Sequence, residues 1–119
     1  MSGASRYSTS STQSRVMTAD ELRLVRLLLA SADPPMPTPQ GLDSMFVVAL
    51  NDGGMGSIRF LSRGAQETSR RFAKRVAETE FADDDGVPVS AALNIDQFGE
   101  LFELDIWKAD FSPLGHLPR

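Results

Sequence analysis

Residues 101–114 read Leu-Phe-Glu-Leu-Asp-Ile-Trp-Lys-Ala-Asp-Phe-Ser-Pro-Leu and are the most strongly patterned part of the chain. An apolar set alternates here with a polar set, namely Phe102, Leu104 and Ile106 with Glu103, Asp105 and Trp107. A period of two predicts a half-buried β-strand with one apolar face and one mostly acidic face. Because aromatic and charged side chains are common at interfaces, the acidic face is a candidate recognition surface. An ordinary strand with solvated acids and a tryptophan that covers the sheet is the alternative interpretation.

The composition sets the class of protein. A chain of 119 residues with 41% hydrophobic and 24% charged residues predicts one soluble domain with a modest core. The absence of cysteine excludes disulfides, thiolate metal sites and cysteine nucleophiles, and it fits a reducing compartment. No apolar run approaches the roughly 20 residues that span a bilayer, and the N-terminus lacks the apolar core of a secretory signal. We therefore expect a cytoplasmic protein with no membrane partner.

The charge is distributed unevenly along the chain. Residues 1–77 hold ten Lys/Arg and six Asp/Glu, whereas residues 78–119 hold two Lys/Arg and ten Asp/Glu. The two parts therefore carry +4 and −8, which sum to the net charge of −4. The bases are scattered without interleaved aromatics, so we expect no nucleic-acid partner. The acidic part predicts a cationic partner, although acids also serve simply to solvate turns and strand faces.

The first third of the chain predicts a tail and a helix. Residues 1–16 are rich in Ser, Thr, Gly and Gln and predict a disordered tail, which leaves 17–119 as a single domain. Thr18-Ala-Asp-Glu21 fits a capping box, so a helix should begin at about Thr18 and continue to Ser31. Apolar residues recur at helical spacing at Leu22, Val25, Leu28, Leu29 and Ala32. Asp33-Pro34-Pro35 ends the helix.

The remainder of the chain predicts strands and hairpins. Met45–Leu50 and Ser57–Leu61 flank a loop whose glycines suit a tight turn and lack the phosphate-binding motifs. Residues 63–76 are open between helix and strand, but the turn Asp83-Asp-Asp-Gly86 favours a strand over about Arg75–Ala82. Val87–Ile95 alternates cleanly, and its Pro88 suits an edge strand or the first position of a strand. We expect an α+β domain in which the helix packs on an antiparallel sheet of about five strands, a meander of hairpins.

The residues offer little support for catalysis. The carboxylates could form acid–base pairs, but the aspartate triplet lacks the other positions of a calcium loop. His116 lies near the chain end, where a general base is poorly positioned, and no serine lies in a GxSxG motif. We expect a protein that is not an enzyme and uses no cofactor or metal. A carboxylate-based enzyme that depends on a divalent metal, with an unknown reaction, is the alternative.

Three segments resemble an uncharacterised family of small bacterial proteins that is known as a domain of unknown function. They are Asn51–Ser57, Glu80–Val89 and Phe102–Leu114, and the likeness spans roughly Met17 to Pro118. The resemblance implies a short N-terminal helix followed by an antiparallel sheet. Some members are similar to immunity proteins that are encoded beside bacterial toxins. The family has no established catalytic residues to transfer, so its likeness concerns fold and bacterial origin more than function.

Together these observations predict a protein-binding module, with an immunity protein that occludes the basic site of a toxin as the specific case. The partner-binding residues that we predict are Glu103, Asp105, Trp107, Asp110, Asp83, Asp84 and Asp85. Their carboxylates would attract a basic surface and raise the association rate, and Trp107 would act as the anchor. The sequence does not predict the oligomeric state.

Overall fold

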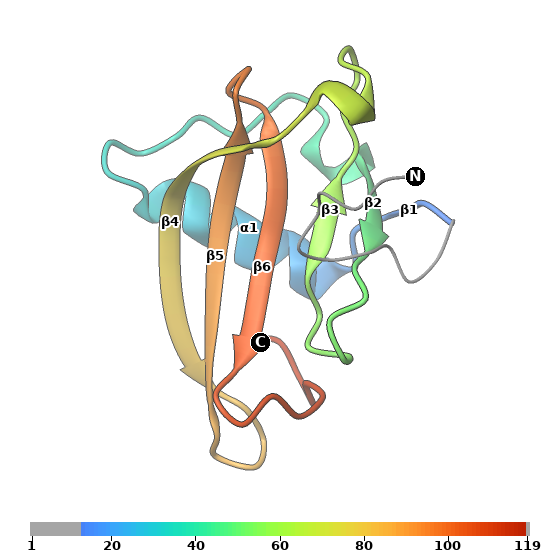
Figure 1. The fold of residues 1–119 in the computed structure, drawn as a ribbon. Helices are drawn as coiled ribbons and strands as arrows, with labels where there is room; N and C mark the ends of the chain where they lie inside the picture. Colours follow the sequence, from blue (N-terminus) through green and yellow to red (C-terminus); the bar gives the residue numbers. More distant parts are fainter. Residues whose placement is uncertain (1–12, 119) are drawn as a thin grey trace.

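The computed structural model describes residues 13–118, in which a single sheet is packed against one α-helix (Figure 1). In chain order the elements are β1 (Arg15–Val16), α1 (Ala19–Ser31), the 3₁₀ helix η1 (Leu42–Ser44), β2 (Phe46–Ala49), β3 (Ile58–Phe60), the 3₁₀ helix η2 (Glu67–Ser69), β4 (Phe72–Ala82), β5 (Pro88–Asp96) and β6 (Leu101–Lys108). All strand pairs are antiparallel, which confirms the predicted α+β class. No helix among the described residues is long and apolar enough to cross a membrane.

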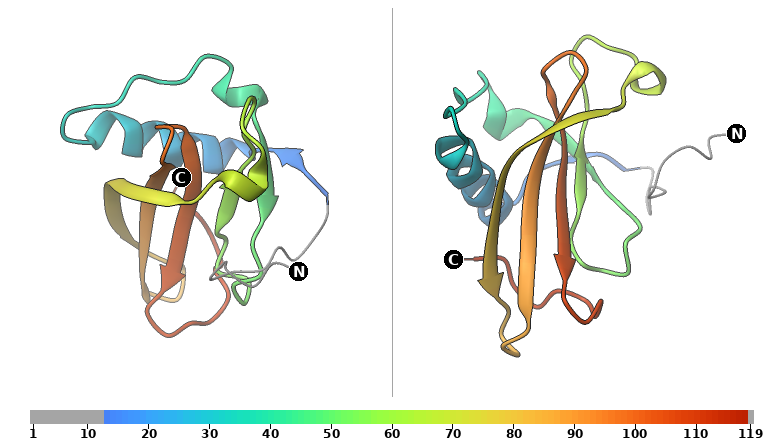
Figure 2. Two further views of the ribbon diagram at one scale, coloured as in Figure 1. Left: turned by 45° about the horizontal axis from the view of Figure 1, so that its top comes forward. Right: turned by 60° about the vertical axis from the view of Figure 1, so that its left-hand side comes forward.

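Helix α1 begins where the capping box predicts. The Thr18 hydroxyl accepts a hydrogen bond from the Glu21 amide at 3.1 Å, and the Glu21 carboxylate accepts one from the Thr18 amide at 2.9 Å. These bonds satisfy two amides that the first helical turn would otherwise leave unpaired. The buried side of the helix consists of Leu24, Val25, Leu28 and Leu29. This apolar side lies against one face of the sheet, as both views of Figure 2 show.

The sheet has six strands rather than the five that we predicted, in the order β1-β2-β3-β6-β5-β4. The additional strand is β1, in which Arg15 pairs with Val47 and Val16 with Phe46 of β2. It falls in the stretch that was predicted to be a disordered tail. Residues 1–12 of that stretch lie outside the described residues.

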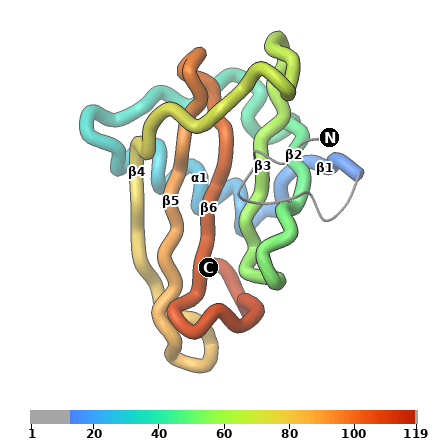
Figure 3. The backbone as a smooth tube through the Cα atoms, in the orientation of Figure 1, coloured from blue at the N-terminus to red at the C-terminus, as the bar shows by residue number. Residues whose placement is uncertain are grey.

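The prediction of a simple meander was wrong, because β3 lies beside β6 and not beside β4. The chain leaves β3, passes over one end of the sheet through η2 and descends as β4 at the far edge (Figure 3). The pairing of β3 with β6 places Ile58 opposite Leu104 and Arg59 opposite Glu103. It thus buries an apolar pair on one face and joins opposite charges on the other.

The neighbouring strands β5 and β6 supply much of the core. Leu93 pairs with Leu104 and Ala91 with Ile106, and all four are 0% exposed. Near the start of β6, Asn94 pairs with Glu103 but Ile95 pairs with Leu101, so β6 contains an extra residue, a β-bulge. We predicted that Phe102 shares the core with Leu104 and Ile106.

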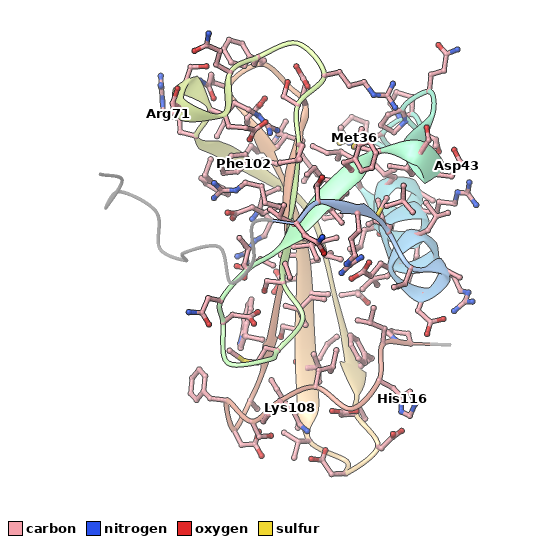
Figure 4. The ribbon with its side chains drawn as sticks, turned by 90° about the vertical axis from the view of Figure 1, so that its right-hand side faces the viewer. Met36, Asp43, Arg71, Phe102, Lys108 and His116 are labelled. Atoms are coloured by element: carbon pink, nitrogen blue, oxygen red, sulfur yellow. The ribbon has the colours of Figure 1, made fainter. Side chains whose placement is uncertain are left out.

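The bulge changes that assignment. Leu101 joins the hydrophobic core, whereas Phe102 is buried outside it, on the face away from α1 (Figure 4). The guanidinium carbons of Arg59 and Arg70 lie 4.5 Å and 5.2 Å from the centre of its ring. The inserted residue interrupts the period of two, so Leu101 takes the core position that alternation assigns to Phe102, while Leu104 and Ile106 stay in the core. The alternation in the sequence does not show where this insertion falls.

Arg70 holds the crossing segment to the sheet. Its buried guanidinium donates hydrogen bonds to the Asp96 carboxylate at 2.8 Å, to Phe60 O at 2.7 Å and to Leu101 O at 2.6 Å. It also bonds to the Glu67 carboxylate of η2 at 2.9 Å. One side chain therefore joins the ends of β3, β5 and β6 to the segment that leads into β4.

Strand β4 confirms the expected strand in the ambiguous region, and η2 supplies the helical turn before it. Gly86 closes the β4–β5 turn with φ 80°, a left-handed value that favours glycine. Pro88 is the first residue of β5, one of the two positions that we expected for it. The glycine-rich loop before β3 is held by Asp52, whose carboxylate accepts hydrogen bonds from the amides of Met55 and Ser57.

Candidate binding surface

Trp107 lies on the face of the sheet that is turned away from α1. On β5 its neighbour is Ser90, and the next pair along the same face is Asp105 with Ala92. Within residues 13–118 no helix or strand covers this face (Figure 2). The Trp107 ring is half-buried, and the guanidinium carbon of Arg75 lies 6.0 Å from its centre. A partly exposed aromatic ring therefore lies on this face of the sheet.

Two of the acids that we predicted to bind a partner precede Trp107 in β6, and their side chains are largely buried. Glu103 forms an ion pair with Arg59 at 2.5 Å, and its side chain is 12% exposed. Asp105 is 3% exposed. A role for Glu103 and Asp105 in binding stays a prediction, but the Glu103 carboxylate already has a basic partner within the chain.

At the end of the sheet, Asp83 and Lys108 form a buried ion pair at 2.9 Å, with side chains 1% and 4% exposed. The Asp83 carboxylate also accepts hydrogen bonds from the amides of Gly115 at 2.7 Å and His116 at 3.0 Å. Lys108 reaches Pro113 O at 3.3 Å. The pair therefore attaches the C-terminal segment to the β4–β5 turn. The Asp83 carboxylate is thus engaged in contacts within the chain.

Asp84 and Asp85 extend this cluster to the surface. The Asp85 carboxylate accepts a hydrogen bond from Lys108 at 2.6 Å and remains 50% exposed. Asp84 is 64% exposed and contacts the His116 ring. Figure 4 shows Lys108 and His116 near one another at this end of the molecule.

The hydrogen bonds in this cluster shift the pKa values of its members. Bonds from the Gly115 amide and from Lys108 hold the pKa of Asp83 well below its ordinary value. The bond from Lys108 likewise lowers the pKa of Asp85, and the two carboxylates raise the pKa of Lys108. All three groups therefore stay charged at neutral pH, which makes these carboxylates poor general acids.

The loop after β6 presents an aromatic side chain that sequence reasoning missed. Phe111 is 72% exposed and has φ 61°, which is a rare conformation for a bulky residue. The loop is braced around it, because the Phe111 amide donates to Lys108 O at 2.9 Å and the Leu114 amide donates to Gly54 O at 3.0 Å. The Asp110 carboxylate accepts bonds from the Ser112 amide and hydroxyl, which lower the pKa of Asp110. Strained backbone at an exposed residue is a recognised feature of functional sites.

The structure thus brings five of the seven predicted residues to the end of the sheet at which β6 finishes. Glu103 and Asp105 lie nearer the start of β6, with Asp105 next to Trp107 on the same face. We call the surface formed by Asp84, Asp85, Trp107, Asp110 and Phe111 the acidic end. The sequence contained no pattern that distinguishes Phe111 from a core phenylalanine, because its exposure follows from the left-handed turn. Lys108 joins the β4–β5 turn to the segment after β6. In the sequence its only distinguishing feature is that it is an isolated base among acids.

A family model for a domain of unknown function, DUF6984, matches residues 14–118 of the chain. The chain belongs to this family. No curated protein and no solved structure matches it. The DUF6984 match covers the helix and all six strands of the sheet, so the described fold is the fold of the family domain in this chain.

The structure offers little support for an active site built on carboxylates. One pocket of about 360 Å³ is lined by Glu21 and Asp52 together with Arg15. However, Glu21 pairs with Arg15 at 2.8 Å and caps α1, and Asp52 holds its own loop. Among residues 13–118 no group of three or more acidic or histidine side chains is arranged to hold a metal ion. That the protein uses no cofactor stays a prediction.

Proposed function

We propose that this DUF6984 domain is a protein-binding module that takes up a basic partner at the acidic end, with an immunity protein that occludes a toxin as the specific case. The observation that carries the proposal is Phe111, an aromatic side chain that is 72% exposed and held by a braced loop that also contains the Asp110 carboxylate. Exposed aromatics in charged surroundings are frequent hot spots of protein interfaces.

The two parts of the acidic end would act at different stages of binding. The carboxylates of Asp84, Asp85 and Asp110 would steer a basic surface toward this end and raise the association rate. Phe111 and Trp107 would then be buried against the partner and slow its dissociation. Because the buried pair of Asp83 and Lys108 fixes the two loops beforehand, little ordering would be required on binding. A partner held there would have its basic site covered, which is the mechanism of an occluding inhibitor.

Affinity capture with matched baits tests the proposal. The wild-type domain and the variant Asp84→Lys/Phe111→Gly would be immobilised and exposed to lysate of the source organism. The control is Asp43→Lys, because Asp43 is exposed and lies on the α1 side of the molecule, away from the acidic end (Figure 4). Wild type and control should retain the same basic protein, and the double variant should lose it.

The retained protein would then be purified and titrated against each bait by calorimetry. Its affinity should fall at least about tenfold for the double variant, since charged and aromatic contacts are both removed. Equal affinity for all baits, or capture of no protein by the wild type, would contradict the proposal.

A further inference from the structure

The longest strand of the sheet, β4, lies at one edge and has eleven residues, whereas β1 at the other edge has two. An edge strand has backbone amides and carbonyls on one side that its own sheet does not pair, and these groups readily pair with another strand. The right-hand view of Figure 2 looks toward this edge, with β4 on the near side of the sheet and α1 to its left, on one face of the sheet. The edge is therefore long and accessible enough to accept a further strand.

The charges of β4 are separated along its length. Lys74 and Arg75 lie in its first half and Glu78 and Glu80 in its second half, and all four side chains are exposed. The change from the basic to the acidic part of the whole chain, between residues 77 and 78, thus falls in the middle of this edge. Charges of a single sign on an edge strand keep copies apart, but an edge with two oppositely charged halves is self-complementary.

We propose that β4 pairs antiparallel with β4 of a second copy of this chain, around a two-fold axis near Ala77. In this arrangement Lys74 of one copy lies directly opposite Glu80 of the other, and the same contact recurs on the far side of the axis. Arg75, which pairs with Glu78 of its own strand at 3.4 Å, lies opposite Thr79 and next to the Glu80 position of the other copy. Parallel pairing would place like charges together. The two sheets become one continuous sheet, with both α1 helices on one face and both acidic ends free.

An exposed aromatic side chain agrees with the same pairing. Phe72, at the start of β4, is 52% exposed. Antiparallel pairing places it beside the second half of β4 in the other copy, where Phe81 is only partly buried against the core. The register of β4 against β5 shifts between Phe72 and Lys74 and between Arg75 and Ala77. The first half of β4, whose pairing with β5 is irregular, would therefore lie beside the regularly paired second half of β4 in the other copy.

The proposal is tested by two charge-reversal variants that are complementary to each other. Lys74→Glu/Arg75→Glu makes β4 acidic throughout, and Glu78→Lys/Glu80→Lys makes it basic throughout. Analytical ultracentrifugation over the micromolar range should show a wild-type dimer that each variant alone weakens at least about tenfold, because like charges then oppose each other. An equimolar mixture of the two variants should form a heterodimer. Asp43→Lys serves as the control and should leave the wild-type dimer unchanged.

Hydrogen exchange provides a readout on unmodified protein. Backbone amides of β4 should exchange more slowly as the wild-type concentration rises, whereas those of β2 should not change. A wild type that stays monomeric, a dimer that both reversals leave intact, or variants that remain apart on mixing would each overturn the proposal. Circular dichroism checks that the variants fold. Glu78→Lys/Glu80→Lys leaves all residues of the acidic end and Arg75 unchanged, whereas Lys74→Glu/Arg75→Glu removes the Arg75 contact with Trp107. Self-association is measured without the partner, so its result is distinguishable from that of partner capture.

Discussion

Replacing Arg70 with methionine is expected to lower the free energy of unfolding by about 3–5 kcal/mol, because the substitution leaves a buried charge without its partner. The side chains of Arg70 and Asp96 are both 0% exposed, and their charged atoms lie 2.8 Å apart. Methionine has a similar length but donates none of the hydrogen bonds that Arg70 makes to Phe60 O and Leu101 O. Domains of this size are stabilised by about 5–15 kcal/mol in total. The loss corresponds to a fall of roughly 10–20 °C in Tm.

The pKa of Asp96 is relevant to the magnitude of this effect. Burial alone would raise it, but the hydrogen bonds from Arg70 and from the amides of Glu100 and Phe98 outweigh burial and lower it. Asp96 is therefore ionised in the folded protein at neutral pH. Without Arg70, the carboxylate must either stay charged in a buried position or take up a proton, and both outcomes cost stability.

Urea unfolding, followed by the fluorescence of the single tryptophan, measures the loss. Arg71→Met is the matched control, because Arg71 is exposed and its replacement should change stability by less than about 0.5 kcal/mol. Asp96→Asn tests the direction of the stability change in two backgrounds. It should destabilise the wild type but stabilise the Arg70→Met variant, in which it removes the unpaired charge. A cost below about 1 kcal/mol for Arg70→Met, as for an exposed ion pair, would refute the reasoning, as would further destabilisation of that variant by Asp96→Asn.

Three further predictions concern single positions. Phe111→Gly should be more stable than Phe111→Ala by about 1 kcal/mol in urea unfolding, the reverse of the usual order, because φ is 61° there; equal stabilities would contradict this. Trp107→Ala should cost less than half of the roughly 3–5 kcal/mol expected for Phe60→Ala, since Trp107 is half-buried and Phe60 is 0% exposed; thermal melts that give equal losses would assign Trp107 to the core. Because folding lowers the pKa of Asp83, its stabilisation is complete above an unfolded pKa of about 3.9 and disappears below it. The free energy of unfolding should therefore depend less on pH below about pH 4 for Asp83→Asn than for wild type. Equal pH dependence of the two proteins would exclude this role.

The elements that the sequence predicted correctly are those that local signals specify. The capping box at Thr18, the proline pair after α1 and the alternation in Val87–Ile95 involve residues a few positions apart, so their physical causes are visible in the sequence. The pairing of β3 with β6 joins residues more than forty positions apart. No local pattern selects that partner over β4, and the bulge that moves Phe102 out of the core arises only when β5 and β6 are aligned.

The candidate site was predictable only in part, for the same reason. The sequence indicated that Asp84 and Asp85 lie in a turn, and it marked Asp110 only as a further acidic residue after the last strand. It could not indicate that Lys108 joins these two segments, because that contact spans more than twenty residues. Nor could it separate Asp83, which is buried, from Asp84, which is exposed, although they are neighbours in one turn.

The uneven charge of the chain therefore has two physical origins, and only one of them concerns a partner. Bases from the first part pair with acids from the second part inside the fold, as Arg59 does with Glu103 and Arg70 with Asp96. These pairs hold the β2–β3 hairpin and the crossing segment against β5 and β6, so part of the asymmetry is a consequence of the topology. A count of acids along the sequence does not distinguish such internal carboxylates from the exposed ones. A basic partner can be attracted only by the charge that remains outside the fold, which is concentrated at the acidic end and along the second half of β4.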